Sequence, residues 1–210
     1  MEKLIKGLHK FKNEIFYQRK DFFKSLAEGQ KPEVFFITCS DSRINPNLFT
    51  STDPGELFIS RNVGNIVPIA GIQNSEAVAI EFALNQLNIE HIIICGHYHC
   101  GALQAALTVD LIKDMPNLAE WIKVNIVPTV DLVKVNYNPK NDLAFLDLLT
   151  QEHVLRQVEN LKTYKIINDK LLNGNLTIHA WIYKFETGEI FSFNSVDNQF
   201  ECITDCKQNN

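Results

Sequence analysis

Apolar residues near the N-terminus recur with the period of an α-helix. The stripe alternates spacings of four and three residues and consists of Leu4, Leu8, Phe11, Ile15, Phe22 and Leu26. Gly29 and Pro32 in "EGQKP" are stop signals, so we expect the helix to end there. The helix precedes the first predicted strand, and its apolar face needs a surface. That surface belongs either to this chain or to a second copy, and the pattern leaves the choice open.

Three short runs further along are apolar without interruption and predict strands. They are "VFFIT" (34–38), "LFIS" (57–60) and "HIIIC" (91–95). Runs of this kind are typical of central strands in a parallel sheet that helices cover on each side. Between the second and third runs, "NSEAVAIEFALNQL" (74–87) predicts a helix capped by Asn74 or Ser75.

The rest of the chain continues the alternation of helices and strands. We expect helices over "GALQAALTVDLI" (101–112) and near 117–136 and 141–172, with Pro128 bending or splitting the second and Gly174 stopping the third. "LTIHAWIY" (176–183) and "EIFSF" (189–193) predict a hairpin. The predicted fold class is therefore α/β, a single domain over residues 1–210. A central, mostly parallel sheet is flanked by helices, with a C-terminal hairpin or antiparallel edge strand and an N-terminal helical arm over residues 1–30.

Composition restricts the classes of partner. The chain has 210 residues, 45% hydrophobic and 21% charged, with a net charge of −5 and no basic patch, so we expect no nucleic-acid partner. It shows no secretory signal and no apolar stretch long enough for a bilayer, which predicts a cytoplasmic protein without a membrane partner. Five cysteines, an odd number, argue against a disulfide framework and favour buried, catalytic or metal-bound thiols.

Two polar motifs follow the first and third predicted strands. "CSDSR" (39–43) comes after "VFFIT", and "GHYHCG" (96–101) comes after "HIIIC". Parallel strands bring both motifs to the same carboxyl edge, where open α/β folds bind ligands. If the backbone stays extended in the first motif, Cys39, Asp41 and Arg43 share one face.

The spacing within the second motif separates its candidate metal ligands. His97 and Cys100 stand three positions apart and lie on one side of a tight turn, whereas His99 diverges and Cys95 belongs to the strand. Together with Cys39, His97 and Cys100 provide three nitrogen or sulfur ligands. That number is typical of a catalytic zinc site, in which one coordination position stays free of protein ligands.

Both motifs in this order resemble the β-class carbonic anhydrases, whose zinc is held by C-x-D-x-R and H-x-x-C. "GELFISRNVGNIVP" (55–68), "IEHIIICGHYHCGALQAAL" (89–107) and "HAWIYKFETGEI" (179–190) are similar to family segments as well. The resemblance implies that Cys39, His97 and Cys100 hold one Zn²⁺ per chain. It also implies reversible hydration of CO2 to bicarbonate and a proton, by attack of zinc-bound hydroxide.

The resemblance further implies roles for seven residues near the zinc. Asp41 and Arg43 form a catalytic dyad in which Asp41 accepts a hydrogen bond from the hydroxide and Arg43 holds Asp41. The substrate-binding positions are Gln30, Phe58, Val63, Phe82 and Gly101, and Phe82 replaces a frequent tyrosine. Gln30 matches a glutamine that reaches a neighbouring subunit's active site, which predicts a homodimer or a dimer of dimers. Phe36, where a second branch has tryptophan, favours the plant-like branch with an open site.

The expected ligand set bears on the pH dependence of the reaction. Two thiolates and the Asp41 carboxylate disfavour ionisation of a zinc-bound water, so kcat/KM for CO2 should rise above neutral pH. The proton must then leave, and His91, Tyr98 and His99 are candidates for its shuttle.

Alternatives to these functional interpretations stay open. The three metal-ligating residues fit a purely structural zinc site or buried thiols, the dyad fits a structural ion pair, and the three apolar pocket residues fit plain core. The competing functions are hydrolysis of a CO2 analogue (carbonyl sulfide or carbon disulfide) and a non-catalytic zinc-binding or redox-sensing domain.

The remaining predictions concern single cysteines and histidines. We expect a buried Cys95, Cys202 and Cys206 as tail thiols, His9 and His153 on helix surfaces, a structural rather than catalytic His99, and no role for His179.

Overall fold

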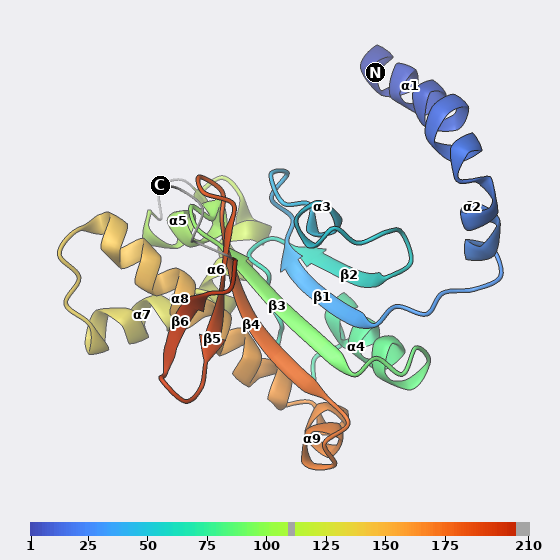
Figure 1. Cartoon of the computed structure of the whole chain (residues 1–210). Coiled ribbons are helices and arrows are strands. Elements are labelled where there is room, and N and C mark those ends of the chain that lie inside the picture. The colour runs from blue at the N-terminus through green and yellow to red at the C-terminus, as the bar shows by residue number, and fades with distance from the viewer. Residues whose placement is uncertain (109–111, 205–210) are drawn as a thin grey trace.

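A six-stranded sheet organises the chain, which is seen as a computed structural model describing residues 1–108 and 112–204 (Figure 1). The strand order is β2-β1-β3-β4-β5-β6. The first four strands are parallel, and β5 and β6 are antiparallel additions after β4. The bounds are β1 Val34–Cys39, β2 Leu57–Asn62, β3 His91–His97, β4 Thr177–Lys184, β5 Glu189–Asn194 and β6 Gln199–Cys202. The predicted α/β class with a mostly parallel sheet is confirmed.

Helices alternate with the parallel strands, as the sequence predicts. The arm contains α1 Glu2–Lys10, the π-helix η1 Phe11–Phe16 and α2 Lys20–Leu26; the body contains α3 Pro46–Thr50, α4 Ser75–Asn85, α5 Gly101–Leu107, α6 Pro116–Asn125, α7 Val127–Asn136, α8 Asp142–Lys162 and α9 Lys165–Leu172. Asn74 caps α4 by accepting a 2.9 Å hydrogen bond from the Ala77 N–H. Pro128 lies in the first turn of α7, and the predicted helix over 117–136 is indeed split there. The end of the helix expected over 101–112 falls partly on residues 109–111, outside the described residues.

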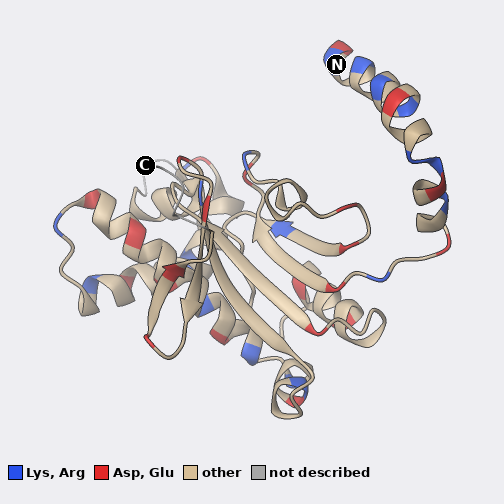
Figure 2. Cartoon of the chain, in the orientation of Figure 1, with Lys and Arg blue, Asp and Glu red and all other residues tan. Residues whose placement is uncertain are grey.

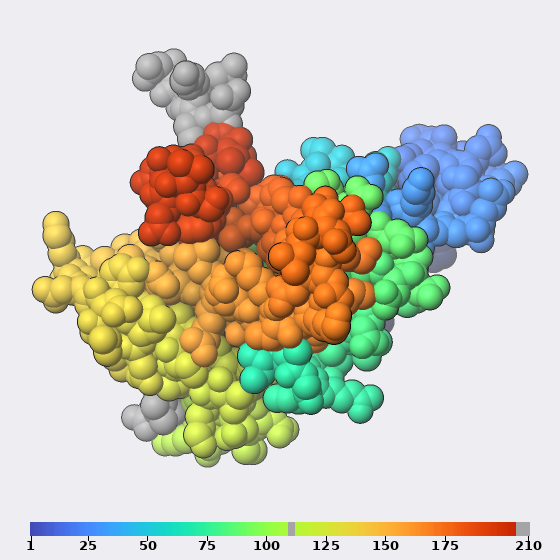
Figure 3. All heavy atoms as spheres, turned by 90° about the horizontal axis from the view of Figure 1, so that it is seen from below, coloured from blue at the N-terminus to red at the C-terminus, as the bar shows by residue number. Residues whose placement is uncertain are grey.

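The main core lies on one face of the sheet. Phe35 and Ile37 of β1 and Ile92 and Ile94 of β3 point to this face, because alternate residues of a strand share a side. Residues of α4, α8 and α9 complete the cluster, and Figure 3 shows the surfaces of α4 and α9 adjoining on the outside. This layer positions the strand ends where the polar motifs begin.

The opposite face of the sheet is thinly covered in this chain. Its cluster holds Phe36, Ile93 and Cys95, with the half-buried rings of Trp181 and Tyr183 beside them. Phe49 of α3 packs on Tyr183 at a ring distance of 4.9 Å. Helices therefore flank the sheet as expected, although on this face α3 is the short helix that packs against the cluster.

The N-terminal arm projects away from the body (Figure 1). Its apolar stripe finds no surface on its own chain: α1 buries no residue, and Leu4 and Leu8 are 63% and 67% exposed. The stripe is broken by η1 and by a change of direction near Arg19. Acidic and basic residues are interspersed along the arm and over the body (Figure 2).

Three local expectations need correction. "LFIS" forms β2, which is an edge strand and not a central one. Apolar side chains on both faces of a strand do not show whether the strand has a hydrogen-bonded neighbour on both sides, so the sequence could not reveal this. Strand β6 was not expected. It pairs with β5 after a turn in which Asn198 has a φ of 53°. Because β6 ends at Cys202, this cysteine is a strand residue and does not lie in a tail. Cys206 lies outside the described residues. His153 is only 1% exposed and lies inside the protein, not on a helix surface.

Candidate metal centre

The ends of β1 and β3 bring Cys39 and His97 together. The two strands are parallel neighbours in which Thr38 pairs with Cys95, so their last residues emerge side by side. Cys39 is the final residue of β1 and His97 the final residue of β3. The topological prediction that both motifs meet at one carboxyl edge is therefore what the structure shows.

A tight turn brings Cys100 back towards His97. His99 takes a left-handed backbone conformation with a φ of 55°, which reverses the chain after β3. The Tyr98 N–H donates a 3.1 Å hydrogen bond to the Tyr183 carbonyl and ties this turn to β4. Cys100 then occupies the N-cap of α5, at the positive end of the helix dipole, where a thiolate is stabilised.

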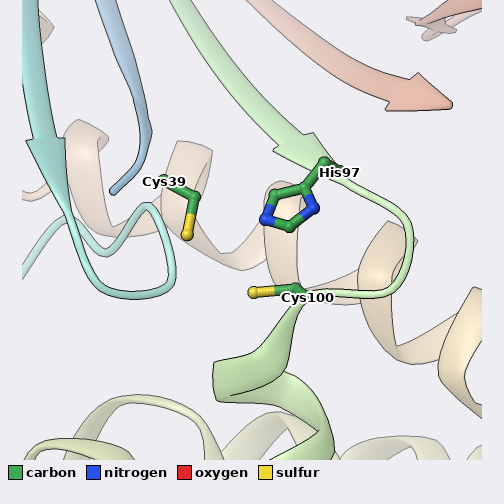
Figure 4. A group of neighbouring side chains, drawn as sticks. All are labelled: Cys39, His97 and Cys100. Carbon is green, nitrogen blue, oxygen red and sulfur yellow. The ribbon is translucent and has the colours of Figure 1, made fainter. Parts of the chain in front are cut away.

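The three side chains converge on one point (Figure 4). The Sγ atoms of Cys39 and Cys100 and a ring nitrogen of His97 all lie within 4.8 Å of one another, and the three residues are 5%, 3% and 1% exposed. Nδ1 of His97 lies 2.8 Å from the Tyr98 carbonyl oxygen, so this nitrogen carries the proton. Nε2 is then a lone-pair atom, and it is buried without a hydrogen-bond partner.

These donors fit a zinc ion. A buried, partnerless ring nitrogen costs free energy unless a ligand uses it, and two thiols with one imidazole are a common zinc set. No fourth cysteine or histidine joins the group among the described residues. Closed structural zinc sites take four protein ligands, so three donors leave a position for water or substrate.

The two thiols share a proton when no metal is present. The hydrogen bond from Cys100 lowers the pKa of Cys39 to about 4, with further help from the Gly64 N–H 3.4 Å from Cys39 Sγ. The same hydrogen bond and burial raise the pKa of Cys100. Cys39 is thus the thiolate of the pair, and a metal would displace the remaining proton.

Arg43 holds the Asp41 carboxylate in a bidentate grip. Nε and Nη2 donate to the two carboxylate oxygens at 2.9 and 2.7 Å, and the Arg43 backbone N–H adds a bond of 3.0 Å. These hydrogen bonds hold the pKa of Asp41 well below its usual range. The backbone has left the extended conformation here, so the two side chains meet through a turn and not through the strand alternation that the sequence suggested.

Asp41 lies beside the donors without joining them. Its Oδ2 is 3.9 Å from Nε2 of His97, and it is not a member of the three-ligand group. The Arg43 guanidinium is fixed in turn by the His99 carbonyl at 3.1 Å and by the Phe185 ring at 4.3 Å. This arrangement keeps the carboxylate engaged with arginine and leaves the metal position open.

A cavity of about 310 Å³ opens onto the centre. Cys39 and Asp41 lie at its base, and Val63 and Gly101 line it, with Ser40, Ala102 and Leu118 completing the wall. Two of the five predicted substrate-binding residues are therefore at the chain's own centre. The cavity is more apolar than polar in its lining residues, which suits a small uncharged molecule.

The other three predicted substrate-binding residues lie at the opposite end of the sheet. Phe58 pairs in register with Phe35, four residues before Cys39 in β1, which is roughly 13 Å along the strand. Phe82 contacts Phe58 at a ring distance of 5.8 Å. Gln30 lines a separate cavity of about 710 Å³ with Gln86 and His91. Within one chain, these residues do not reach the centre.

The three candidates for the proton shuttle do not lie together at the centre. His91 begins β3 and lies 3.5 Å from His179, at the far end of the strand from the centre. His99 Nε2 contacts the Glu186 carboxylate at 2.5 Å, and Tyr98 packs against the core. Cys95 is fully buried, as predicted, and burial raises the pKa of its thiol to about 12.

Sequence reasoning missed two residues that fix the centre. Arg61 of β2 donates to the carbonyls of Cys39 and Asp41 at 3.0 and 2.7 Å. Gly64 supplies the N–H that faces Cys39 Sγ. Both lie in "GELFISRNVGNIVP". The motif spacing gave no signal for either, because each contact involves a backbone group: Arg61 binds two carbonyls and Gly64 acts through its own N–H.

Known proteins match the chain over most of its length. The family model described as carbonic anhydrase matches residues 34–190. The carbonic anhydrase of Synechococcus elongatus is 43% identical over 98% of this chain and 76% of its own length, and that of Pseudomonas aeruginosa is 34% identical over 98% and 93%. The solved structure of the β-carbonic anhydrase CcaA superposes with a TM-score of 0.92 at 40% identity, covering 96% of this chain and 98% of that one.

Proposed function

Because the chain belongs to the β-class carbonic anhydrases and catalyses the reversible hydration of CO2 to bicarbonate, we propose that Cys39, His97 and Cys100 hold its catalytic zinc. The observation that carries the proposal is the buried His97 Nε2, which has no hydrogen-bond partner and faces two thiols next to a carboxylate held by arginine. The relatives are named carbonic anhydrases, which favours hydration over hydrolysis of a CO2 analogue.

Bound at these donors, zinc would act as a Lewis acid that lowers the pKa of a coordinated water and so supplies a nucleophile. Asp41 carries only acceptor oxygens when ionised, and Arg43 keeps it ionised. Asp41 therefore accepts the remaining hydrogen of the nucleophile and directs a lone pair towards carbon. Val63 and Gly101 line the cavity beside Asp41, and their uncharged surfaces suit CO2.

The negative charges at the centre set the expected pH dependence. Two thiolates cancel the charge of Zn²⁺, and Asp41 adds another negative charge nearby, so ionisation of water is harder than beside three imidazoles. Stopped-flow CO2 hydration with metal analysis tests the proposal: one zinc per chain and a kcat/KM that rises from neutral to alkaline pH are expected. Zinc-loaded protein without hydration at any pH would indicate a non-catalytic zinc domain instead.

We further propose a homodimer, or a dimer of dimers, as the active unit. The stripe of the arm is an apolar surface left largely exposed by the described part of the chain. Gln30, Phe58 and Phe82 would serve a neighbouring subunit's centre, since the sheet length separates them from their own.

The cellular setting follows from the thiol chemistry. Zinc ligation requires Cys39 and Cys100 to stay reduced, which a cytoplasmic location provides. Among residues 1–108 and 112–204, no helix has both the length and the apolarity to traverse a bilayer.

A further inference from the structure

Helix α8 carries a polar stripe on its buried side. The side chains of His153, Gln157 and Asn160 recur at spacings of four and three residues, so they lie on one face of the helix, and Tyr164 follows just beyond its end. His153 and Gln157 are 1% and 0% exposed. Buried polar side chains are costly unless they have partners, and here the partners belong to a single loop.

The stripe bonds the backbone of the loop over residues 62–68, which follows β2. His153 Nε2 lies 2.8 Å from the Gly64 carbonyl oxygen, and Gln157 Oε1 accepts a 2.9 Å bond from the Val67 N–H. Asn160 donates to the Val67 carbonyl at 2.9 Å, and the Tyr164 hydroxyl donates to the Pro68 carbonyl at 2.8 Å. Three side chains of α8 and one just beyond it thus hold several peptide groups of the loop.

The neighbours of His153 determine which ring nitrogen carries the proton. The Gln157 Nε2 amide is a donor 3.4 Å from His153 Nδ1, so Nδ1 accepts and Nε2 carries the N–H that faces Gly64. Burial lowers the pKa of His153 to about 4, so the ring is neutral at working pH. Both observations make His153 a neutral donor to the Gly64 carbonyl.

The loop needs such support because its backbone is strained. Gly64 and Asn65 both have positive φ angles, 88° and 46°. Conformations of this kind persist only where the surroundings impose them. On its opposite side the loop is held by Trp121, whose Nε1 donates a 2.8 Å bond to the Val63 carbonyl.

Gly64 also faces the candidate centre, through its other peptide group. Its N–H, on the Val63–Gly64 peptide, points at Cys39 Sγ, and Val63 lines the cavity. We propose that His153, supported by Gln157, is a positioning residue: by binding the Gly64 carbonyl it fixes the residue whose N–H faces the Cys39 thiolate, and it thereby tunes the thiolate's donation to the metal. This inference rests on the proposed metal site at Cys39, His97 and Cys100.

Cobalt substitution tests the inference without relying on activity. A hydrogen bond stabilises the thiolate lone pair, so losing it shifts the thiolate-to-cobalt charge-transfer band to longer wavelength. We expect this shift in Co²⁺-loaded His153→Leu, which keeps the volume but loses the donor, together with a fall in kcat/KM of roughly tenfold or more. His153→Gln keeps an N–H donor at similar reach and should restore the wild-type band.

Leu161→Ala is the matched control, because it opens the core under the same helix without removing a side-chain hydrogen bond to the loop. It should lower the thermal stability and leave the band in place. An unshifted band in His153→Leu, with a loss of stability like that of Leu161→Ala, would overturn the inference and leave His153 a purely structural residue. Should His153→Leu fail to fold, Gln157→Met interrupts the same network and must shift the band. A wild-type protein without a thiolate-to-cobalt band would instead refute the metal site itself.

Discussion

Arg43 determines the state of Asp41. A carboxylate this close to His97 and two thiols could itself ligate a metal, but the bidentate hydrogen bonds of Arg43 and its backbone N–H satisfy both oxygens. The guanidinium is fixed on its far side by the His99 carbonyl and the Phe185 ring. Asp41 is therefore available as an acceptor beside the metal and is not needed as a fourth ligand.

Asp41→Ala should separate metal binding from catalysis. We expect zinc content to stay at the wild-type level and kcat/KM for CO2 hydration to fall by about 10²-fold or more, since an acceptor that orients the nucleophile is lost. Metal analysis and stopped-flow kinetics measure the two quantities. Asp131→Ala removes a carboxylate from the exposed side of α7 and should change neither. Loss of zinc from Asp41→Ala would make Asp41 a ligand.

His153 makes stability depend on pH. Its folded pKa of about 4 lies below the usual 6.5, so the unfolded chain binds the proton more readily than the folded one. Stability is complete above pH 6.5 and is lost as pH falls from 6.5 towards 4, by on the order of 2 kcal/mol between pH 7 and pH 5. Urea unfolding of wild type and His153→Gln at both pH values isolates this component as the difference between the proteins. Equal pH dependence in both would contradict it.

At the scale of elements, α8 links the sheet to the loop that follows β2. The helix packs on β3 and β4 and also bonds Gly64 and Val67. Gly96 lies where the helix approaches β3 most closely: a Cβ there would come within 2.5 Å of Val154 Cγ2. Because Gly96 directly precedes His97, the helix–strand distance and the position of a metal-ligating residue are set together.

Gly96→Ala should therefore overpack this contact. We expect a loss of about 1–3 kcal/mol in the free energy of unfolding, measured by urea titration, and a lower zinc affinity. The double variant Gly96→Ala/Val154→Ala provides room for the new methyl group and should recover part of the loss, relative to the sum of the single variants. Purely additive effects of the two substitutions would argue against the contact.

At the scale of the whole molecule, the arm is held to its own body by little. The described contacts include a pair between Arg19 and Asp53, which are 40% and 46% exposed in their side chains. Surface pairs of this kind contribute about 0–1 kcal/mol, far less than an apolar stripe of this length gains from burial. We therefore expect a second copy of the chain to bury this apolar stripe.

Leu8→Glu should weaken the assembly. Placing a charge in the stripe costs the burial free energy of leucine, so sedimentation should show dissociation at concentrations where wild type stays associated, together with reduced activity. Asn13→Glu adds the same charge to the opposite, exposed face of the arm and should leave the mass unchanged. A fully active wild-type monomer would exclude the shared site.

Mixed assemblies test whether Gln30 acts across the interface. Gln30→Ala and Asp41→Ala should each be nearly inactive alone. In a hybrid of the two, the Gln30→Ala chain keeps its own Asp41 and receives Gln30 from its partner, so one intact centre forms. Unfolding and refolding an equal mixture should therefore restore activity. If Gln30 served its own chain, the mixture would remain as inactive as its components.

The local elements and the grouping of Cys39, His97 and Cys100 followed from the sequence. Apolar runs and caps predicted the parallel strands and body helices, because those signals depend on neighbouring residues. Parallel topology then brought Cys39 next to His97 and Cys100, because equal strand direction puts the following motifs at one edge.

Tertiary structure alone decided the features that depend on which surfaces meet. The edge position of β2, the packing of Phe49 on the second sheet face, the buried His153 and the Gly64 amide on Cys39 all involve contacts between segments far apart in the chain. The helical period of a sequence shows which residues lie on the same side of a helix. It does not show whether a histidine on that side contacts water or another segment of the chain. Residue type and spacing thus determined what the centre is made of, and packing determined what holds it in place.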